Sequence, residues 1–126
     1  MSAAEELAAA AVAALRAIDG LGIYDGPPVQ AVAPYAIVET GPEIDWSHKS
    51  GAGRELRLAV TLRDKGERRE RIRRMAAAAE AAVAGIGQDL GAWRVVTLRF
   101  QRSRLIRDRS GEWVGVTEFR ARVLAE

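Results

Sequence analysis

Residues 54–64, RELRLAVTLRD, alternate between apolar and polar side chains over most of their length. The apolar positions of the alternation are Leu56, Leu58, Val60 and Leu62. The polar positions between them include Arg57, Thr61 and Arg63. Because successive side chains of a strand point to opposite faces of its sheet, the pattern predicts a strand with one face in the core and one in water.

An amphipathic helix is predicted before this strand. Ser2 and Glu5 have the spacing of a capping box, and Gly20 and Gly22 favour the end of the helix just after residue 18. Its apolar stripe comprises Leu7, Ala11, Ala14, Leu15 and Ile18. This stripe is weakly apolar, so the helix must pack on another element to be stable.

A second helix is predicted after the strand. Asp64 and Glu67 repeat the capping spacing, and Gly85 and Gly87 end the helical pattern. The apolar face comprises Ile72, Met75, Ala76, Ala79, Val83 and Ile86. The spacing also predicts two acid-first ion pairs on the helix surface, Glu67 with Arg71 and Glu70 with Arg74.

Three further strands are expected, over residues 35–40, 93–107 and 112–124, and residues 108–111 favour a tight turn between the last two. Residues 23–34 are expected to form a connector, since Asp25-Gly26 favours a turn and Pro27-Pro28 excludes helix. Residues 41–53 are expected to form a long loop.

The order α-β-β-α-β-β predicts an α+β fold in a single domain, residues 1–126. We expect one mostly antiparallel four-stranded sheet with both helices packed on one face. Phe100 shares a face with Val96 and Leu98, which favours a place in the core, and Phe119 is expected there as well. The predicted core residues are Leu56, Leu58, Val60, Leu62, Ile72, Met75, Phe100 and Phe119.

Composition favours a soluble globular protein, with 48% hydrophobic and 29% charged residues among 126. The formal charge of +2 does not by itself call for nucleic acid. No apolar run approaches the ~20 residues of a membrane span, so no membrane partner is expected. The chain is expected to stay in the cytoplasm unless a particle carries it out.

No catalytic or metal site is predicted. The chain has no cysteine, and its one histidine, His48, lies in a glycine-rich segment without a second imidazole. Metal sites need three or four ligands, and a catalytic histidine needs a positioned partner. The sequence also lacks a phosphate-binding glycine loop. We therefore expect neither an enzyme nor a cofactor.

Basic and apolar residues outside the core indicate contact surfaces. Arginines crowd the predicted start of the second helix, where solvation, an acidic protein partner and nucleic acid all remain open for them. Arginines also follow the third strand and its turn, and arginine on a sheet can bind phosphates. Aromatic residues that could stack on bases are absent from residues 99–109 apart from Phe100. Ile44 and Trp46 either fold back on their own sheet or form a mobile arm that docks on a neighbouring subunit. The candidate subunit or tube interface comprises Ile44, Trp46, His48, Arg57, Arg63, Arg99, Arg102, Arg104, Arg120 and Arg122.

Several segments in this order resemble the tail completion or tail terminator proteins of long-tailed phages. They are the leading helix, residues 23–25 with the prolines after them, PYAIV at 34–38, GRE at 53–55, the strand 56–62, the arginine- and alanine-rich helix, RVVTLRF at 94–100 and FRARV at 119–123. No single motif is specific, but their order and spacing cover nearly the whole chain. Gene transfer agents, which are phage-like particles of some bacteria, carry similar proteins.

The resemblance implies a structural virion protein that is assembled in the host cytoplasm. It implies a ring, usually of six subunits, that caps the head-proximal end of the tail tube, stops tube growth and joins the tail to the head connector. The implied partners are further copies of the chain, the tube protein and the connector or stopper protein, with DNA only as cargo passing through the lumen. A head–tail connector or minor tail component, and a small basic nucleic-acid-binding module, remain as alternatives.

Overall fold

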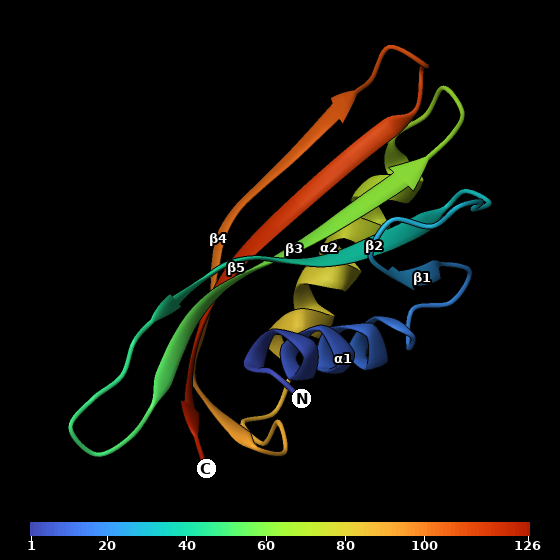
Figure 1. The fold of residues 1–126 in the computed structure, drawn as a ribbon. Helices are drawn as coiled ribbons and strands as arrows, with labels where there is room; N and C mark the ends of the chain where they lie inside the picture. Colours follow the sequence, from blue (N-terminus) through green and yellow to red (C-terminus); the bar gives the residue numbers. More distant parts are fainter.

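The computed structural model describes residues 1–126, and its central strand is β3 (Gly53–Asp64). On one side β3 pairs with β2 (Tyr35–Asp45), and on the other with β5 (Trp113–Ala125); both pairings are antiparallel. Two strands form the sheet edges: β4 (Trp93–Arg107) is antiparallel to β5, and β1 (Gly22–Asp25) is parallel to β2. The result is a five-stranded mixed sheet of order β1-β2-β3-β5-β4 (Figure 1).

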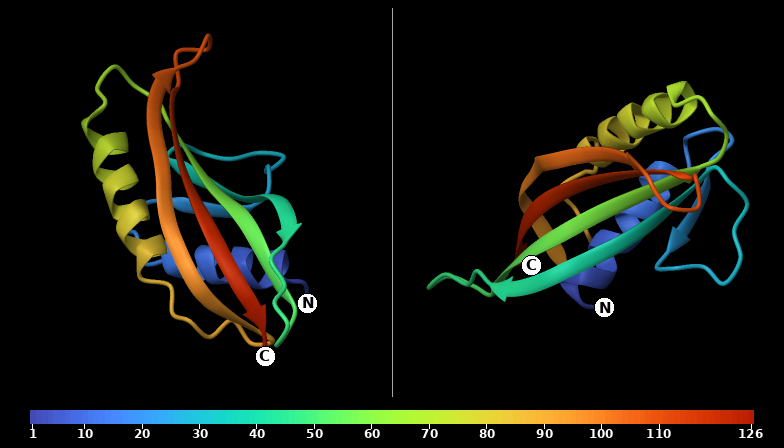
Figure 2. Two further views of the ribbon diagram at one scale, coloured as in Figure 1. Left: turned by 90° about the vertical axis from the view of Figure 1, so that its left-hand side faces the viewer. Right: turned by 90° about the horizontal axis from the view of Figure 1, so that it is seen from above.

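Both helices, α1 (Ala3–Leu15) and α2 (Glu70–Ala84), pack on the same face of the sheet, as Figures 1 and 2 show. The alternation in β3 explains this arrangement, because its four large apolar side chains face the helices. Leu56, Leu58, Val60 and Leu62 are buried there, together with Ile72, Met75 and Phe119. No helix covers the opposite face, which we call the outer face (Figure 2).

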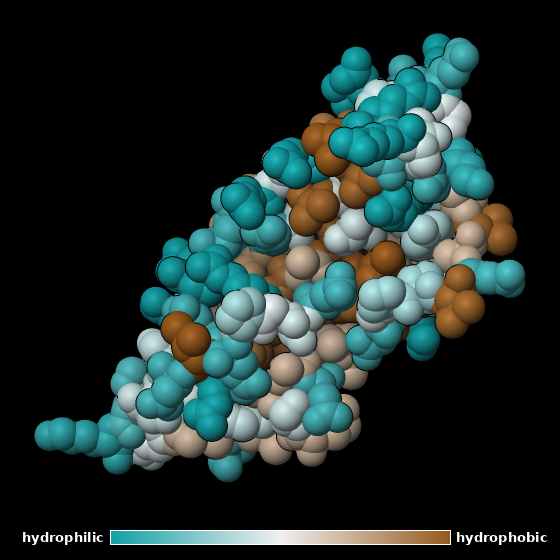
Figure 3. Space-filling model, turned by 45° about the horizontal axis from the view of Figure 1, so that its top comes forward, coloured by the Kyte–Doolittle hydropathy of each residue, from teal (hydrophilic) through white to brown (hydrophobic).

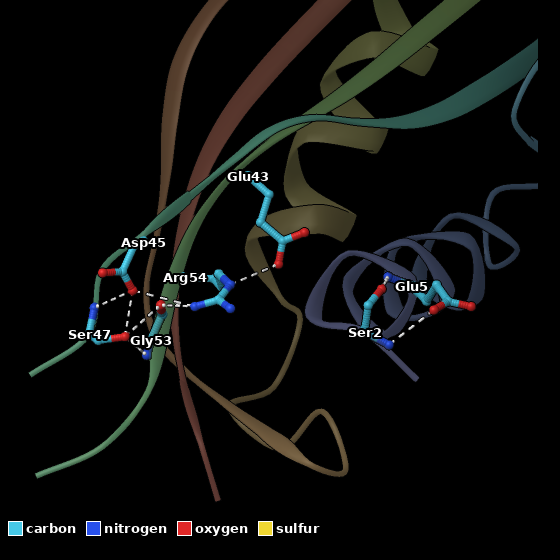
Figure 4. A network of polar contacts seen from close by, with 7 residues as sticks. All are labelled: Ser2, Glu5, Glu43, Asp45, Ser47, Gly53 and Arg54. Carbon is cyan, nitrogen blue, oxygen red and sulfur yellow. Dashed lines mark hydrogen bonds and ion pairs between the residues drawn. The ribbon is translucent and has the colours of Figure 1, made fainter.

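The start of α1 confirms the predicted capping box. The Ser2 hydroxyl accepts a hydrogen bond from the Glu5 backbone N–H at 3.1 Å, and the Glu5 carboxylate accepts one from the Ser2 N–H at 3.0 Å (Figure 4). The helix ends earlier than predicted, at Leu15 with Arg16 as its C-cap. Half of the buried residues of α1 are alanines, namely Ala3, Ala8 and Ala11.

The four-stranded antiparallel sheet was an incomplete prediction, because the expected connector contains β1. Four residues are too few to show a periodic pattern, and β1 is held by its parallel pairing with β2 rather than by its own sequence. The Gly26 N–H also donates to the Val38 carbonyl at 2.9 Å, beyond the end of the ladder. The expected loop 41–53 is also shorter in the structure, since β2 continues through a bulge between Thr40 and Glu43 as far as Asp45.

The predicted cap of α2 is wrong. The helix begins at Glu70 behind Arg69, which makes no side-chain capping bond. Asp64 is instead the last residue of β3, only 1% exposed, and its carboxylate accepts hydrogen bonds from the Arg71 guanidinium and the Lys65 N–H. The bond from Arg71 is the main reason that the pKa of Asp64 lies below its usual value.

The two acid-first ion pairs predicted on α2 do not form. Arg71 has turned toward Asp64, and Glu70 contacts Arg68 at 3.8 Å. Because β3 ends directly before the turn into α2, the Asp64–Arg71 contact joins the end of the strand to the first turn of the helix.

The placement of Phe100 in the core is also wrong, since this residue is 46% exposed. It is the cross-strand partner of Phe119 and its ring packs edge-on against the Phe119 ring at 6.0 Å, so it does lie on the helix-bearing face. It sits on the edge strand, where fewer atoms of α2 reach it. Neither helix is long and apolar enough to cross a membrane.

Candidate assembly surfaces

The outer face of the sheet carries the predicted arginines in cross-strand rows. The register pairs Arg57 of β3 with Arg120 of β5, and Arg120 with Arg99 of β4. The neighbouring row toward the carboxyl end of β5 places Glu55 beside Arg122. The row on the other side places Glu118 beside Arg102. Arginines from three strands thus meet on one uncovered surface, as the alternation in the sequence predicted.

Carboxylates neutralise part of this surface. Arg122 donates to Glu55 at 2.8 Å, and Arg102 donates to Glu118 at 2.8 Å. The bond from Arg102 lowers the pKa of Glu118, so this carboxyl stays ionised at neutral pH. Beyond these, Arg63 contacts Asp108 at 3.1 Å and Glu112 at 3.6 Å, where β3 passes the β4–β5 hairpin.

Three arginines of the predicted interface have no carboxylate partner: Arg57, Arg99 and Arg104. Arg57 donates only to the Gln101 side chain, at 3.4 Å. Arg120 comes within 3.9 Å of Glu55, too far for a hydrogen bond, and its buried Nε has no hydrogen-bond partner. The outer face therefore retains free guanidinium groups near its centre.

The β2–β3 hairpin extends past the rest of the sheet as an arm (Figure 1), which we define as residues 44–54. Its turn is held by its own polar groups: the Ser47 hydroxyl donates to Asp45 and accepts from the Gly53 N–H at 3.1 Å, and Arg54 contacts Asp45 at 3.4 Å (Figure 4). The Ser47 hydrogen bond lowers the pKa of Asp45, which keeps this contact charged. The arm is thus an ordered hairpin with hydrogen bonds of its own.

The two large apolar residues of the arm take different positions. Trp46 is half-buried, with the Arg122 guanidinium 5.5 Å from its ring centre and the His48 ring edge-on at 4.5 Å. Ile44 is 53% exposed. Trp46 therefore follows the expectation that it folds back on its own sheet, and Ile44 remains free for another surface.

The turn from β3 to α2 is attached to the β4–β5 hairpin through Trp113, a residue that the sequence did not single out. The Trp113 indole N–H and the Arg107 guanidinium both donate to the Gly66 carbonyl, at 3.1 and 2.8 Å. Arg107 and Arg69 also lie over the Trp113 ring, at 4.6 and 5.6 Å from its centre. Part of the basic cluster at the start of α2 thus serves the fold itself.

Apolar contact surface is scattered. In the direction of view of Figure 3, hydrophilic residues cover most of the surface and hydrophobic residues form separate patches. No group of three or more His, Cys, Asp or Glu side chains is placed to hold a metal ion. The outer face, the long β4 edge and the arm are the candidate surfaces for contact with other proteins.

Comparison with known proteins identifies the family. No match was found among the curated proteins. One solved structure, described as the virion of a native gene transfer agent particle, contains a chain that is 29% identical in sequence to this one. The match has a TM-score of 0.69 and covers 99% of this chain and 100% of that chain. A family model described as tail completion protein gp17 matches residues 5–124. The chain therefore belongs to the tail completion protein gp17 family, and is a structural component of a phage-type virion tail.

Proposed function

We propose that this chain is a tail terminator: six copies form a ring that closes the head-proximal end of the tail tube, stops its polymerisation and presents a surface to the head connector. In this role residues 1–126 act as one domain without catalytic activity. The partners are other copies of the chain, the tube protein and the connector or stopper protein, and DNA only passes through the lumen.

The observation that carries the proposal is the full-length match to a virion chain. The two chains are similar over 99% and 100% of their lengths, so the likeness extends to the arm and the edge strands as well as the core. A family match over residues 5–124 supports the same role.

Those surfaces suit a closed ring. A cyclic ring of identical subunits uses two different surfaces of each subunit, one for each neighbour. The arm with Ile44 and the β4 edge lie in different parts of the molecule (Figure 1) and supply two such surfaces. The β4 edge of the sheet is protected from uncontrolled strand pairing. β4 carries two bulges and several arginines, which discourage edge-to-edge aggregation.

The alternative of a nucleic-acid-binding module has less support. Arg63, Arg102 and Arg122 are engaged by carboxylates of the same chain, and those carboxylates would repel a polyanion. The outer face also offers little for base stacking, since Phe100 packs edge-on against Phe119 on the other face.

The test is removal of the gene from the phage or gene transfer agent that encodes it. Particles without the protein should show overlong tails of variable length and unattached heads in electron micrographs, and a plasmid copy of the gene should restore both. Tails of normal length in the deletion would contradict the proposal. A binding assay of the purified chain against tube protein and against connector protein separates a terminator, which binds the tube, from a connector component, which does not.

A further inference from the structure

A row of three arginines crosses the centre of the outer face. Arg57, Arg120 and Arg99 are direct cross-strand partners on β3, β5 and β4. Side chains in such positions start about 4.5–5.5 Å apart at their Cβ atoms, and like charges directly opposite each other destabilise a sheet. Across three strands the row extends about 10 Å, given the usual strand spacing. We call this set the arginine row.

The chain itself neutralises the arginine row only in part. Arg99 makes no ion pair, and Arg57 has only the side-chain carbonyl of Gln101 at 3.4 Å. Glu55 is 3.9 Å from Arg120 but accepts its hydrogen bond from Arg122 at 2.8 Å. The Nε of Arg120 is buried and makes no hydrogen bond, and a buried donor without a partner costs stability. The free protein thus holds three positive charges together with one long ion pair, from Arg120 to Glu55, among them.

Carboxylates on either side limit what can bind there. Glu55 flanks the row toward the arm, and Glu118 flanks it toward the β4–β5 hairpin. Glu39 and Glu118 also line a hollow in the surface next to Arg57. An extended polyanion such as DNA would have to cross these negative groups, whereas one or two carboxylates from a loop can enter between them. Guanidinium groups bind carboxylates with paired, directed hydrogen bonds.

The geometry points to the arginine row as a docking site for one or two carboxylates on an acidic loop of a neighbouring tail protein. The contact relieves the repulsion between Arg57, Arg120 and Arg99. It rests on the proposed function only in that the neighbour is a tail protein. The outer face is then buried in the assembled particle and does not line the path of the DNA.

The test uses a double variant, Arg57→Gln with Arg99→Gln, which leaves Arg120 in place. Its matched control is Arg16→Gln with Arg73→Gln, two exposed arginines without ion pairs on α1's C-cap and on α2, which make the same change in net charge. Because the row is held against repulsion, the purified double variant should melt at the wild-type temperature or about 1–4 °C above it. A melting temperature several degrees below that of the control would make the row a structural element of the free fold, and would overturn the inference.

Assembly is measured by the amount of the chain that stays on gradient-purified particles, relative to tube protein. The double variant should be retained about tenfold less than wild type and control, since losing charge-assisted hydrogen bonds weakens an interface by that order. Arg57→Lys with Arg99→Lys, which keeps the charge, should restore part of the retention. Equal retention of the double variant and control would overturn the inference.

Two further comparisons separate the alternatives. Wild type and double variant should bind double-stranded DNA equally weakly at low salt; loss of DNA affinity in the double variant with normal retention on particles would assign the row to nucleic acid instead. Normal tail length in the gene deletion would overturn the terminator role alone, because reduced retention of the double variant would still support the arginine row as a docking site.

Discussion

Gly53 lies where the arm meets β3, and replacing it by alanine should disrupt the arm. A Cβ at this position would lie 2.4 Å from the Trp46 backbone carbonyl oxygen and 2.9 Å from Leu124 Cδ2. The first distance is about 1 Å shorter than an ordinary contact, and the atom concerned is backbone, which cannot rotate away. The clash also displaces the Trp46 N–H from the Gly53 carbonyl and the Gly53 N–H from the Ser47 hydroxyl.

Overpacking of this kind costs about 1–3 kcal/mol, so Gly53→Ala should lower the melting temperature by about 4–10 °C in a chain of this size. The assay is thermal unfolding followed by circular dichroism, with tryptophan fluorescence to report on Trp46. Gly51→Ala is the control in the same arm, because its Cβ would meet nothing within 4 Å and its φ is not positive. It should melt at or slightly above the wild-type temperature. If the two variants unfold at the same temperature, the described geometry of the arm is wrong.

Three other substitutions test the fold. Asp64→Asn should lower the free energy of unfolding by about 1.5–3 kcal/mol at neutral pH, because it removes a buried acceptor of charge-assisted hydrogen bonds. The pKa of Asp64 is lowered in the folded state, so the contribution of Asp64 to the free energy of unfolding is complete above the unfolded pKa of about 3.9 and is lost as the pH falls below that value. Urea titrations of the wild type and of Asp64→Asn should therefore give converging free energies of unfolding in that acidic range. A constant difference down to pH 2 would contradict this. Phe119→Ala should lower the free energy of unfolding by about 3–5 kcal/mol, because Phe119 is 1% exposed. Phe100→Ala should lower it clearly less, because Phe100 is 46% exposed. Equal losses of the two variants in urea unfolding would mean that Phe100 is buried after all.

Features with a local cause could be predicted from the sequence. The alternation in β3 has the period of a strand, and its apolar half is buried as expected. The capping box at Ser2 and Glu5 depends on groups three residues apart, and both of its hydrogen bonds form. The hairpin of β4 and β5 follows from a short turn between two long strands.

The errors have tertiary causes. β1 exists because its backbone pairs with β2, which no local pattern records. α2 starts late because Asp64 bonds Arg71 instead of capping the helix. The exposure of Phe100 depends on how far α2 reaches over β4, and the two bulges in β4 change which residues share a face. For the candidate site, the residue types could be predicted, but the arginine row depends on the register of three strands that lie far apart in the sequence.

The proposed terminator role places this chain in a ring at the head-proximal end of the tail. The most direct measurement is a cryo-electron microscopy reconstruction of the head–tail junction of intact particles that carry this protein. If the chain is the terminator, the reconstruction should show one closed ring of density, fitted by this fold, between the last ring of the tail tube and the connector below the head. Density for this chain elsewhere along the tail, or a junction in which tube and connector touch without it, would contradict the claim.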